Sequence, residues 1–240
     1  MLSILKKRTI VLMFGIWLFN TMLISQCLAM DTGFLTDDIA AEDIELIFNK
    51  IELTAIVQPD TFSGFSCFAV NEYGDYALGF DQNEIDTVLV YSADGTFRYG
   101  FTFSNSGSLG LELDQENVIL YFVRSDLAVS VDQNGNCLDA KIIQNTSQNQ
   151  DYWNGEVFAN KRTVNDSVFT AKHWLFNNEH LHWGKYTRLV KLLPDGEEII
   201  LYDATATLLR NVRRIMVLGG TILLLGTILF FRWRNRNRTD

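Results

Sequence analysis

Catalytic motifs are absent from this 240-residue sequence, and cysteine is rare. There is no nucleophile elbow, P-loop, dinucleotide-binding fingerprint or helical zinc signature, so no enzyme class or cofactor is indicated. Outside the first 29 residues only Cys67 and Cys137 occur. One bridge is no disulfide framework, and a chain of this length can build its own core. The pair could form a disulfide, but two buried, unpaired thiols are the interpretation we favour.

Basic residues are depleted in the middle of the chain. Between Met30 and Leu209 there are 28 acidic and 10 basic residues, a formal charge of −18. A field of this sign repels nucleic acid and anionic lipid. We therefore exclude nucleic-acid binding, and a solubilising surface is enough to explain the acidity.

The first of two long uncharged runs has the pattern of an export signal. Residues 9–25 carry no charge and follow Lys6, Lys7 and Arg8. The small residues that come next predict a signal peptide over residues 1–29, cleaved after Ala29. Because the apolar run is slightly long, an uncleaved signal anchor stays open as the alternative.

The second run, Ile215–Phe231, has 17 residues without charge or proline. As a helix it would span about 25 Å, and flanking arginines can snorkel to lengthen it. We predict one transmembrane helix, since a buried core helix rarely lacks a polar face. With an export signal ahead of it, the ectodomain would lie outside the cytoplasm and the C-terminus inside. The tail is expected to contact anionic membrane lipid through Arg232, Arg234, Arg236 and Arg238.

Between Phe65 and Asp203 the sequence is typical of β-hairpins. Runs rich in β-branched and aromatic residues alternate with turn signals. Asp94-Gly95, Asn134-Gly135 and Asp195-Gly196 each suit a tight hairpin turn. We therefore expect an all-β ectodomain.

The three turns recur in similar surroundings. The first two glycines are 40 residues apart, and a further turn precedes each within its unit, at residues 71–75 and 114–117. This predicts about three antiparallel four-stranded meander repeats, each the size of a propeller blade. The third unit is longer, and we expect its surplus, around residues 147–150 and 177–179, to form surface loops.

The segments that carry the repeat are FAVNEYGDYALGF, VLVYSADGTFRYGFTF, VILYFVRSDLAVSVDQNGNCL and RLVKLLPDGEEIILYD. They resemble β-propeller-type repeats similar to those of NHL proteins, and they also resemble single-span envelope proteins of Gram-positive bacteria. The resemblance covers residues 65–203 and implies a propeller-blade-like architecture, but no site residues. Three blades are fewer than the four to eight of ordinary propellers, which leaves an open stack or a six-bladed ring made by two chains.

The segment from Asp43 to Val57 is expected to cover an exposed sheet edge. Its alternation fits two strands joined at Asn49-Lys50, while a helix from Ala40 to Ile51 is the competing interpretation, since its acidic start suits the helix dipole. The predicted domains are the signal (1–29), an N-terminal segment (30–64), the β-repeat ectodomain (65–203), a juxtamembrane segment (204–214), the transmembrane helix (215–231) and the basic tail (232–240).

Two groups of residues are candidates for a site. His173, His180 and His182 could bind zinc or copper, because alternate residues of a strand share a face; a polar loop with a half-exposed strand is the simpler interpretation. Arg124 and Asp126 could face a ligand, whereas a charged turn that pairs its own ends is the alternative.

These features favour a single-pass, membrane-anchored binding module that recognises a protein, peptide or envelope ligand. A membrane-anchored hydrolase or lyase using propeller loops is one alternative, with Asp126, His173, Glu179 and His180 as its acid–base groups, and a structural envelope component is another. The short tail would require a protein partner in the membrane to pass on a signal. Gly219 and Gly226 share a helix face, which suggests a homodimer.

Overall fold

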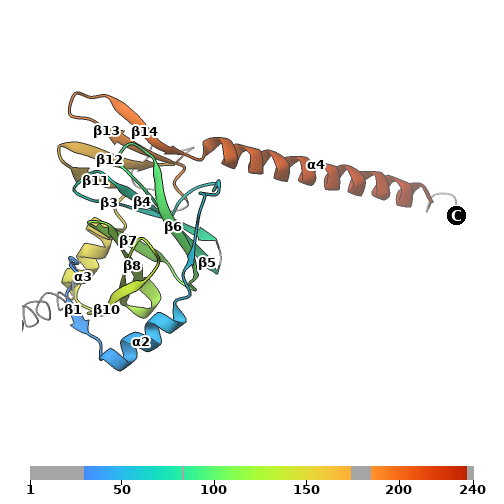
Figure 1. Cartoon of the computed structure of the whole chain (residues 1–240). Coiled ribbons are helices and arrows are strands. Elements are labelled where there is room, and N and C mark those ends of the chain that lie inside the picture. The colour runs from blue at the N-terminus through green and yellow to red at the C-terminus, as the bar shows by residue number, and fades with distance from the viewer. Residues whose placement is uncertain (1–29, 83, 174–184, 237–240) are drawn as a thin grey trace, which may run out of the picture. The chain divides into compact units, whose positions relative to one another are not determined.

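The computed structural model describes residues 30–82, 84–173 and 185–236 (Figure 1). The chain divides into two compact units, residues 1–31 and 32–240, and the account below concerns the second. That unit is mostly β, with three antiparallel sheets and few helices. The predicted signal peptide lies outside the described residues.

Each sheet is built on four consecutive strands that pair with their neighbours in chain order. The first sheet has the order β2-β6-β5-β4-β3, the second β1-β10-β9-β8-β7, and the third β11-β12-β13-β14. The β-rich prediction for residues 65–203 is thereby confirmed at the level of three antiparallel sheets. The strands of the first sheet are β2 (Thr54–Ala55), β3 (Cys67–Val70), β4 (Tyr76–Gln82), β5 (Ile85–Tyr91) and β6 (Phe97–Ser104). Those of the second are β1 (Thr36–Asp38), β7 (Leu109–Asp114), β8 (Asn117–Phe122), β9 (Leu127–Val131) and β10 (Cys137–Ile143), and those of the third are β11 (Lys161–Val164), β12 (Ser167–Lys172), β13 (Arg188–Leu192) and β14 (Glu198–Asp203).

Four hairpin turns share one geometry, and all four lie at predicted positions: three at the Asp-Gly and Asn-Gly dipeptides and one within residues 71–75. Gly74, Gly95, Gly135 and Gly196 have φ between 82° and 90°, and each glycine N–H donates to the carbonyl three residues earlier. The residues that precede these glycines, Tyr73, Asp94, Asn134 and Asp195, do not have positive φ. The loops are therefore type I turns closed by a left-handed glycine, rather than the two-residue primed turns that the dipeptides suggest.

The first sheet is the middle layer, with a hydrophobic cluster on each face. Val88 and Val90 of β5 face the second sheet, whereas Leu89 and Tyr91 face the third. Alternation therefore leaves no polar face, and β5 is buried almost throughout, as in sheets covered on both sides. A Cβ added at Gly79 would lie 2.5 Å from the Sγ atom of Cys67 on the neighbouring strand β3 and 3.0 Å from Leu111 of the second sheet, so glycine is needed where the two sheets pack together.

The N-terminal segment covers the edges of the first two sheets with strands and a helix. The helix alternative for this segment is confirmed as α2 (Ala41–Lys50), and the pair of strands joined at Asn49-Lys50 is wrong. Ile47 and Phe48 of α2 pack on the cluster between the first two sheets. β1 and β2, on either side of α2, add to β10 and β6, so two exposed edges are closed.

The loop expected at residues 147–150 is instead helical, which corrects the prediction. α3 (Ser147–Tyr152) continues into one π-helical turn, η2 (Trp153–Val157). Thr146 caps α3 by accepting a hydrogen bond from the Asn149 N–H at 3.2 Å. Asn149 is fully buried, and its amide exchanges two hydrogen bonds with the backbone of Leu35, at 2.9 and 2.8 Å. Residues 177–179 lie outside the described residues.

The last element is the helix α4 (Thr205–Arg236), which follows β14 directly. Its start is held by the Ala204 N–H, which donates to the Thr187 carbonyl at 2.8 Å. Further along, Ile215, Met216, Val217 and Leu218 are 61–69% exposed. In the part of the chain that the structure describes, no helix combines enough length with enough apolar character to cross a membrane.

Candidate functional site

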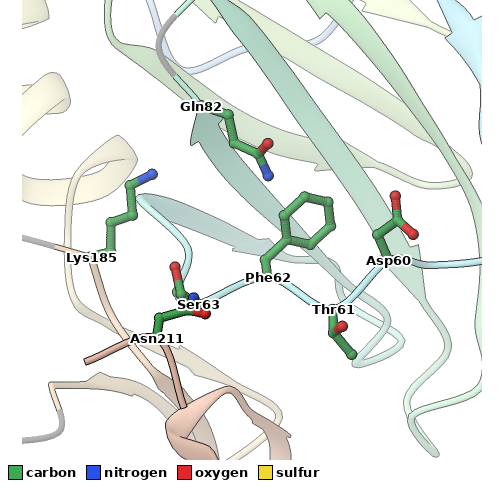
Figure 2. A pocket seen from close by; sticks show the side chains of 8 residues that line it. Asp60, Thr61, Phe62, Ser63, Gln82, Lys185 and Asn211 are labelled. Carbon is green, nitrogen blue, oxygen red and sulfur yellow. The ribbon is translucent and has the colours of Figure 1, made fainter. Parts of the chain in front are cut away.

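A polar pocket of about 420 Å³ lies where the loop before β3, the end of β4 and the start of α4 meet (Figure 2). Its lining includes one carboxylate, one ammonium group, two amides, two hydroxyls and a single aromatic ring. Such a set can hold a small ligand rich in hydroxyl or charged groups. The lining residues are Asp60, Thr61, Phe62, Ser63, Gly64, Gln82, Lys185 and Asn211.

Backbone pairing and ring contacts bring these distant segments together. Phe65 and Tyr186 form an antiparallel bridge, with an N–H donating to a carbonyl at 2.8 Å in each direction, which holds the loop of residues 60–64 beside Lys185. Phe62 stacks on Phe80, with ring centroids 4.2 Å apart, and the Tyr202 hydroxyl donates to the Phe62 carbonyl at 3.5 Å. In Figure 2 the side chain of Gln82 extends toward Phe62.

Lys185 supplies the positive charge of the pocket. Its Nζ donates to the backbone carbonyl of Asp81, which holds the side chain against the end of β4. No ion pair found among the described residues involves Lys185. The ammonium group can therefore still bind an anionic ligand.

A buried carboxylate lies near the pocket, at the same end of the first sheet. Asp86 of β5 is directly opposite Asp81 of β4 and is only 1% exposed. Its Oδ2 accepts a hydrogen bond from Asn105 at 2.6 Å, while Oδ1 has no partner within the described residues. Burial raises the Asp86 pKa to about 6; the Asn105 hydrogen bond and Lys185 act in the opposite direction, and Asp81 adds to the rise.

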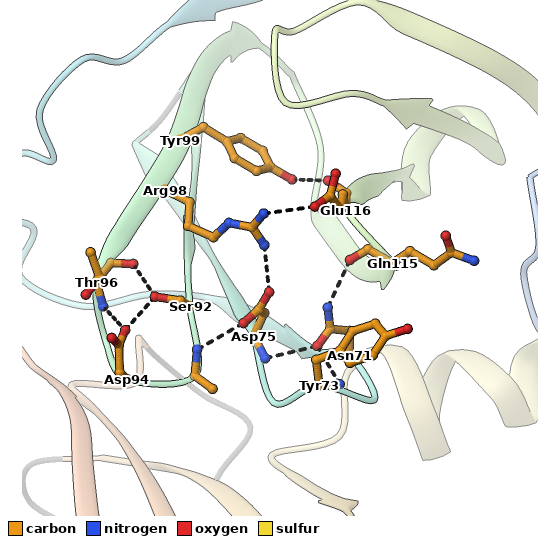
Figure 3. A network of polar contacts seen from close by, with 11 residues as sticks. Asn71, Tyr73, Asp75, Ser92, Asp94, Thr96, Arg98, Tyr99, Gln115 and Glu116 are labelled. Atoms are coloured by element: carbon orange, nitrogen blue, oxygen red, sulfur yellow. Dashed lines mark hydrogen bonds and ion pairs between the residues drawn. The ribbon is translucent and has the colours of Figure 1, made fainter.

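The opposite end of the first sheet carries a polar network between hairpin turns (Figure 3). Arg98 of β6 pairs with Asp75 at 2.6 Å and with Glu116 of the second sheet at 3.3 Å. The Asn71 amide donates to the Gln115 carbonyl at 2.9 Å. These contacts tie the turns of two sheets together, and their groups are satisfied by one another. We therefore assign them a structural role.

A second polar cluster lies between the second sheet, the N-terminal segment and α3. The hydroxyls of Tyr121 and Tyr152 both donate to the Glu112 carboxylate, and Thr32 contacts the Tyr121 hydroxyl at 2.5 Å. Burial raises the pKa of both tyrosines, so their hydroxyls stay protonated donors at neutral pH. Phe34 packs over this cluster with its ring 4.9 Å from Tyr121. The arrangement fixes the N-terminal segment on the second sheet.

The arginine and aspartate singled out in the sequence are both exposed: Arg124 lies within the short 3₁₀ turn η1 (Val123–Ser125), and Asp126 directly follows it. Arg124 donates to the Ser106 carbonyl at 3.4 Å, and Asp126 has φ 49°, with its carbonyl accepting from Ile143. None of the ion pairs in the described part of the chain joins the two. They do not line the pocket.

Of the three histidines, only His173 falls within the described residues, where it follows β12 of the third sheet. His180, His182 and Glu179 lie outside them. Asp126, the other acid–base candidate, belongs to the second sheet, next to β9. Within residues 30–82, 84–173 and 185–236, no three His, Cys, Asp or Glu side chains form a group that could hold a metal ion.

Cys67 and Cys137 are free thiols. Burial raises the Cys67 pKa to about 12 and the Cys137 pKa to about 11, which keeps both protonated and poorly nucleophilic. The two thiols form no disulfide with each other in this structure; Cys67 is buried and Cys137 is partly buried.

Neither a scan against protein-family models nor a search of curated proteins finds a match for this chain. The pocket must therefore be interpreted from its own chemistry. None of its residues was singled out by sequence reasoning, because they come from four separate segments and no motif links them.

Proposed function

We propose that this protein is a single-pass, membrane-anchored binding module whose β-sheet ectodomain lies outside the cytoplasm. The observation that carries the proposal is the polar pocket lined by Asn211 near the start of α4, which is large enough for a small ligand. No cluster of catalytic groups accompanies that pocket among the described residues, so recognition is favoured over catalysis.

Support for the anchor comes from the surroundings of α4. The uncharged run 215–231 falls inside this one continuous helix, and its described apolar side chains near the start pack on no other element. Apolar side chains left this exposed call for a partner, and a lipid bilayer is the partner that an uncharged run of this length suits.

Support for a propeller-type architecture comes from strand pairing. Each sheet joins four strands that are consecutive in the chain, and the sheets stack face to face through two hydrophobic clusters. Edge strands β1 and β2 close the first two sheets within the chain. We therefore favour the open stack over a ring that two chains share.

Protease accessibility tests the topology. Protease added to intact cells, or to protoplasts if a wall is present, is expected to digest the region from Met30 to Leu209 and to leave a C-terminal fragment containing α4 protected. The reason is that the export signal sends this region across the membrane before the second apolar run stops transfer. Immunoblotting with a tag on the C-terminus reads out the protected fragment. An ectodomain that resists protease until the membrane is broken would contradict the proposed orientation.

We also propose that α4 mediates a homodimer. Gly219 and Gly226 lie seven residues apart with nothing within 4 Å of an added Cβ, so a second helix could approach this face closely. Replacing both glycines by leucine is expected to weaken association, measured by cross-linking of the full chain in lipid vesicles. Val217→Leu is the matched control, because it changes an apolar side chain without filling a glycine position. Equal cross-linking of all three chains would contradict the dimer.

A further inference from the structure

The pocket lies close to the level at which α4 would enter the membrane. Asn211 lines the pocket and comes four residues before Ile215, the first residue of the uncharged run. At the helical rise this is about 6 Å along the axis. The polar headgroup layer on each side of the hydrocarbon core is about 5 to 8 Å thick. The pocket is therefore within reach of lipid headgroups, provided that the proposed anchor is correct.

The lining also fits the polar part of a lipid rather than its acyl chains. Asp60, Gln82 and Ser63 offer acceptors and donors suited to hydroxyl groups, and Phe62 is the single aromatic ring. Lys185 offers an ammonium group, which binds phosphate as a point charge. Such a lining offers little apolar surface for a lipid acyl chain to contact.

Cations gather at this end of a chain that is otherwise acidic. Arg210, Arg213 and Arg214 are exposed on the first turns of α4, and no acidic residue lies between Thr205 and Ile215. Arg214 is three residues after Asn211 and so shares its helix face, whereas Arg213 falls on the opposite side. An anionic group held by Lys185 would thus have a second cation nearby.

We propose that this pocket binds a phosphate carrying a hydroxylated substituent, a polyol phosphate, presented as the headgroup of a membrane lipid. The ammonium group of Lys185 and the guanidinium of Arg214 bind the phosphate, and Asp60, Gln82 and Asn211 bind the hydroxyls. A free polyol phosphate offers the pocket the same groups. The two sources differ because only the lipid headgroup is presented by the bilayer.

Calorimetry on the full chain purified in neutral detergent tests this proposal with two probes. Short-chain phosphatidylglycerol below its micelle concentration represents the lipid, and glycerol 1-phosphate represents the free ligand. The lipid is expected to bind more tightly than the free phosphate. Lys185→Ala is expected to weaken lipid binding by about tenfold to a hundredfold, because a charge-assisted hydrogen bond is lost. Lys185→Arg, which keeps the charge, is expected to retain most of the affinity.

Two matched controls separate the pocket from general attraction between charges. Lys191→Ala removes a lysine whose Nζ lies over the Phe169 ring, near the Gly74 turn at the other end of the sheets, and is expected to leave binding unchanged. Arg213→Ala is likewise expected to have little effect, whereas Arg214→Ala should weaken binding. Equal losses for Arg213→Ala and Arg214→Ala would overturn the proposal, as would binding that survives both Lys185→Ala and Gln82→Ala.

The outcome is separable from that of the topology experiment. If protease reaches the ectodomain but neither probe binds, the ligand is wrong and the anchored module stands. If both probes bind equally through Lys185, the ligand is a free polyol phosphate and its lipid source is overturned. If the ectodomain resists protease, the anchor fails whatever the calorimetry shows.

Discussion

Replacing Phe34 by alanine is expected to lower the free energy of unfolding by about 3 to 5 kcal/mol, the usual cost of truncating a buried aromatic side chain. Phe34 is 5% exposed and touches three rings, with centroid distances of 4.9 Å to Tyr121, 4.6 Å to Tyr152 and 4.6 Å to Trp153. The cavity would open between the second sheet and the α3–η2 segment. Neither can collapse into it easily, because Gly33 and Gly110 already bring the backbone close to Tyr152 and Val157.

The measurement is a urea titration of the purified full chain in detergent, followed by circular dichroism. Leu35→Ala is the matched control, since this neighbouring side chain is 42% exposed and its truncation should cost far less. Phe34→Leu, which keeps most of the apolar volume, should fall between the two. Similar losses for Phe34→Ala and Leu35→Ala would show that the segment before β1 is not an integral part of the fold.

Replacing Asp86 by asparagine is expected to raise stability at pH 7.5 by about 1 to 3 kcal/mol. The folded protein holds this acid at a pKa of about 6, above its ordinary value of 3.8. An acid whose pKa is raised by folding stabilises the fold while it is protonated. That contribution is complete below about pH 4 and is lost as the pH rises through 6. At neutral pH the chain therefore keeps a buried charge whose Oδ1 has no partner within the described residues.

The pH dependence provides the decisive measurement. Urea titrations between pH 4.5 and 8 should show the wild-type chain losing stability toward neutral pH, and Asp86→Asn should remove that part of the slope. Asp81→Asn is the control, because Asp81 raises the Asp86 pKa only as a secondary contributor after burial. A loss of stability in Asp86→Asn at pH 7.5, with the wild-type slope retained, would mean that the carboxylate is needed in its charged form.

The hairpins could be predicted because their causes are local. Gly95, Gly135 and Gly196 sit between short apolar runs, and a glycine with positive φ closes a turn whatever the remainder of the chain does. The turn at Asn165-Asp166 was missed, although both residues adopt positive φ, at 47° and 62°, because no glycine marks it. Local chemistry allowed the turn there but did not demand it.

The helical form of residues 147–157 differs from the predicted loop for a related reason. Its start is polar and resembles a loop, and its helical form depends on partners far along the chain. The backbone of Leu35 exchanges two hydrogen bonds with the buried amide of Asn149, and Trp153 packs against Gly110. Local propensity is a weak signal when tertiary contacts of this kind decide the outcome.

The sequence by itself determined the β-rich character of residues 65–203 and the positions of the glycine turns, and it limited the segment from Asp43 to Val57 to two interpretations, a helix or a pair of strands. Each of these depends on neighbours within a few residues. Only the tertiary structure decided that the first sheet is the middle layer, that β2 pairs at its edge and that β1 pairs at the edge of the second sheet. It also decided that Asp60, Gln82, Lys185 and Asn211 meet in one pocket. The physical reason is that such contacts join residues far apart in the chain, and they form only when sheet pairing and the burial of both faces of the first sheet bring those residues together.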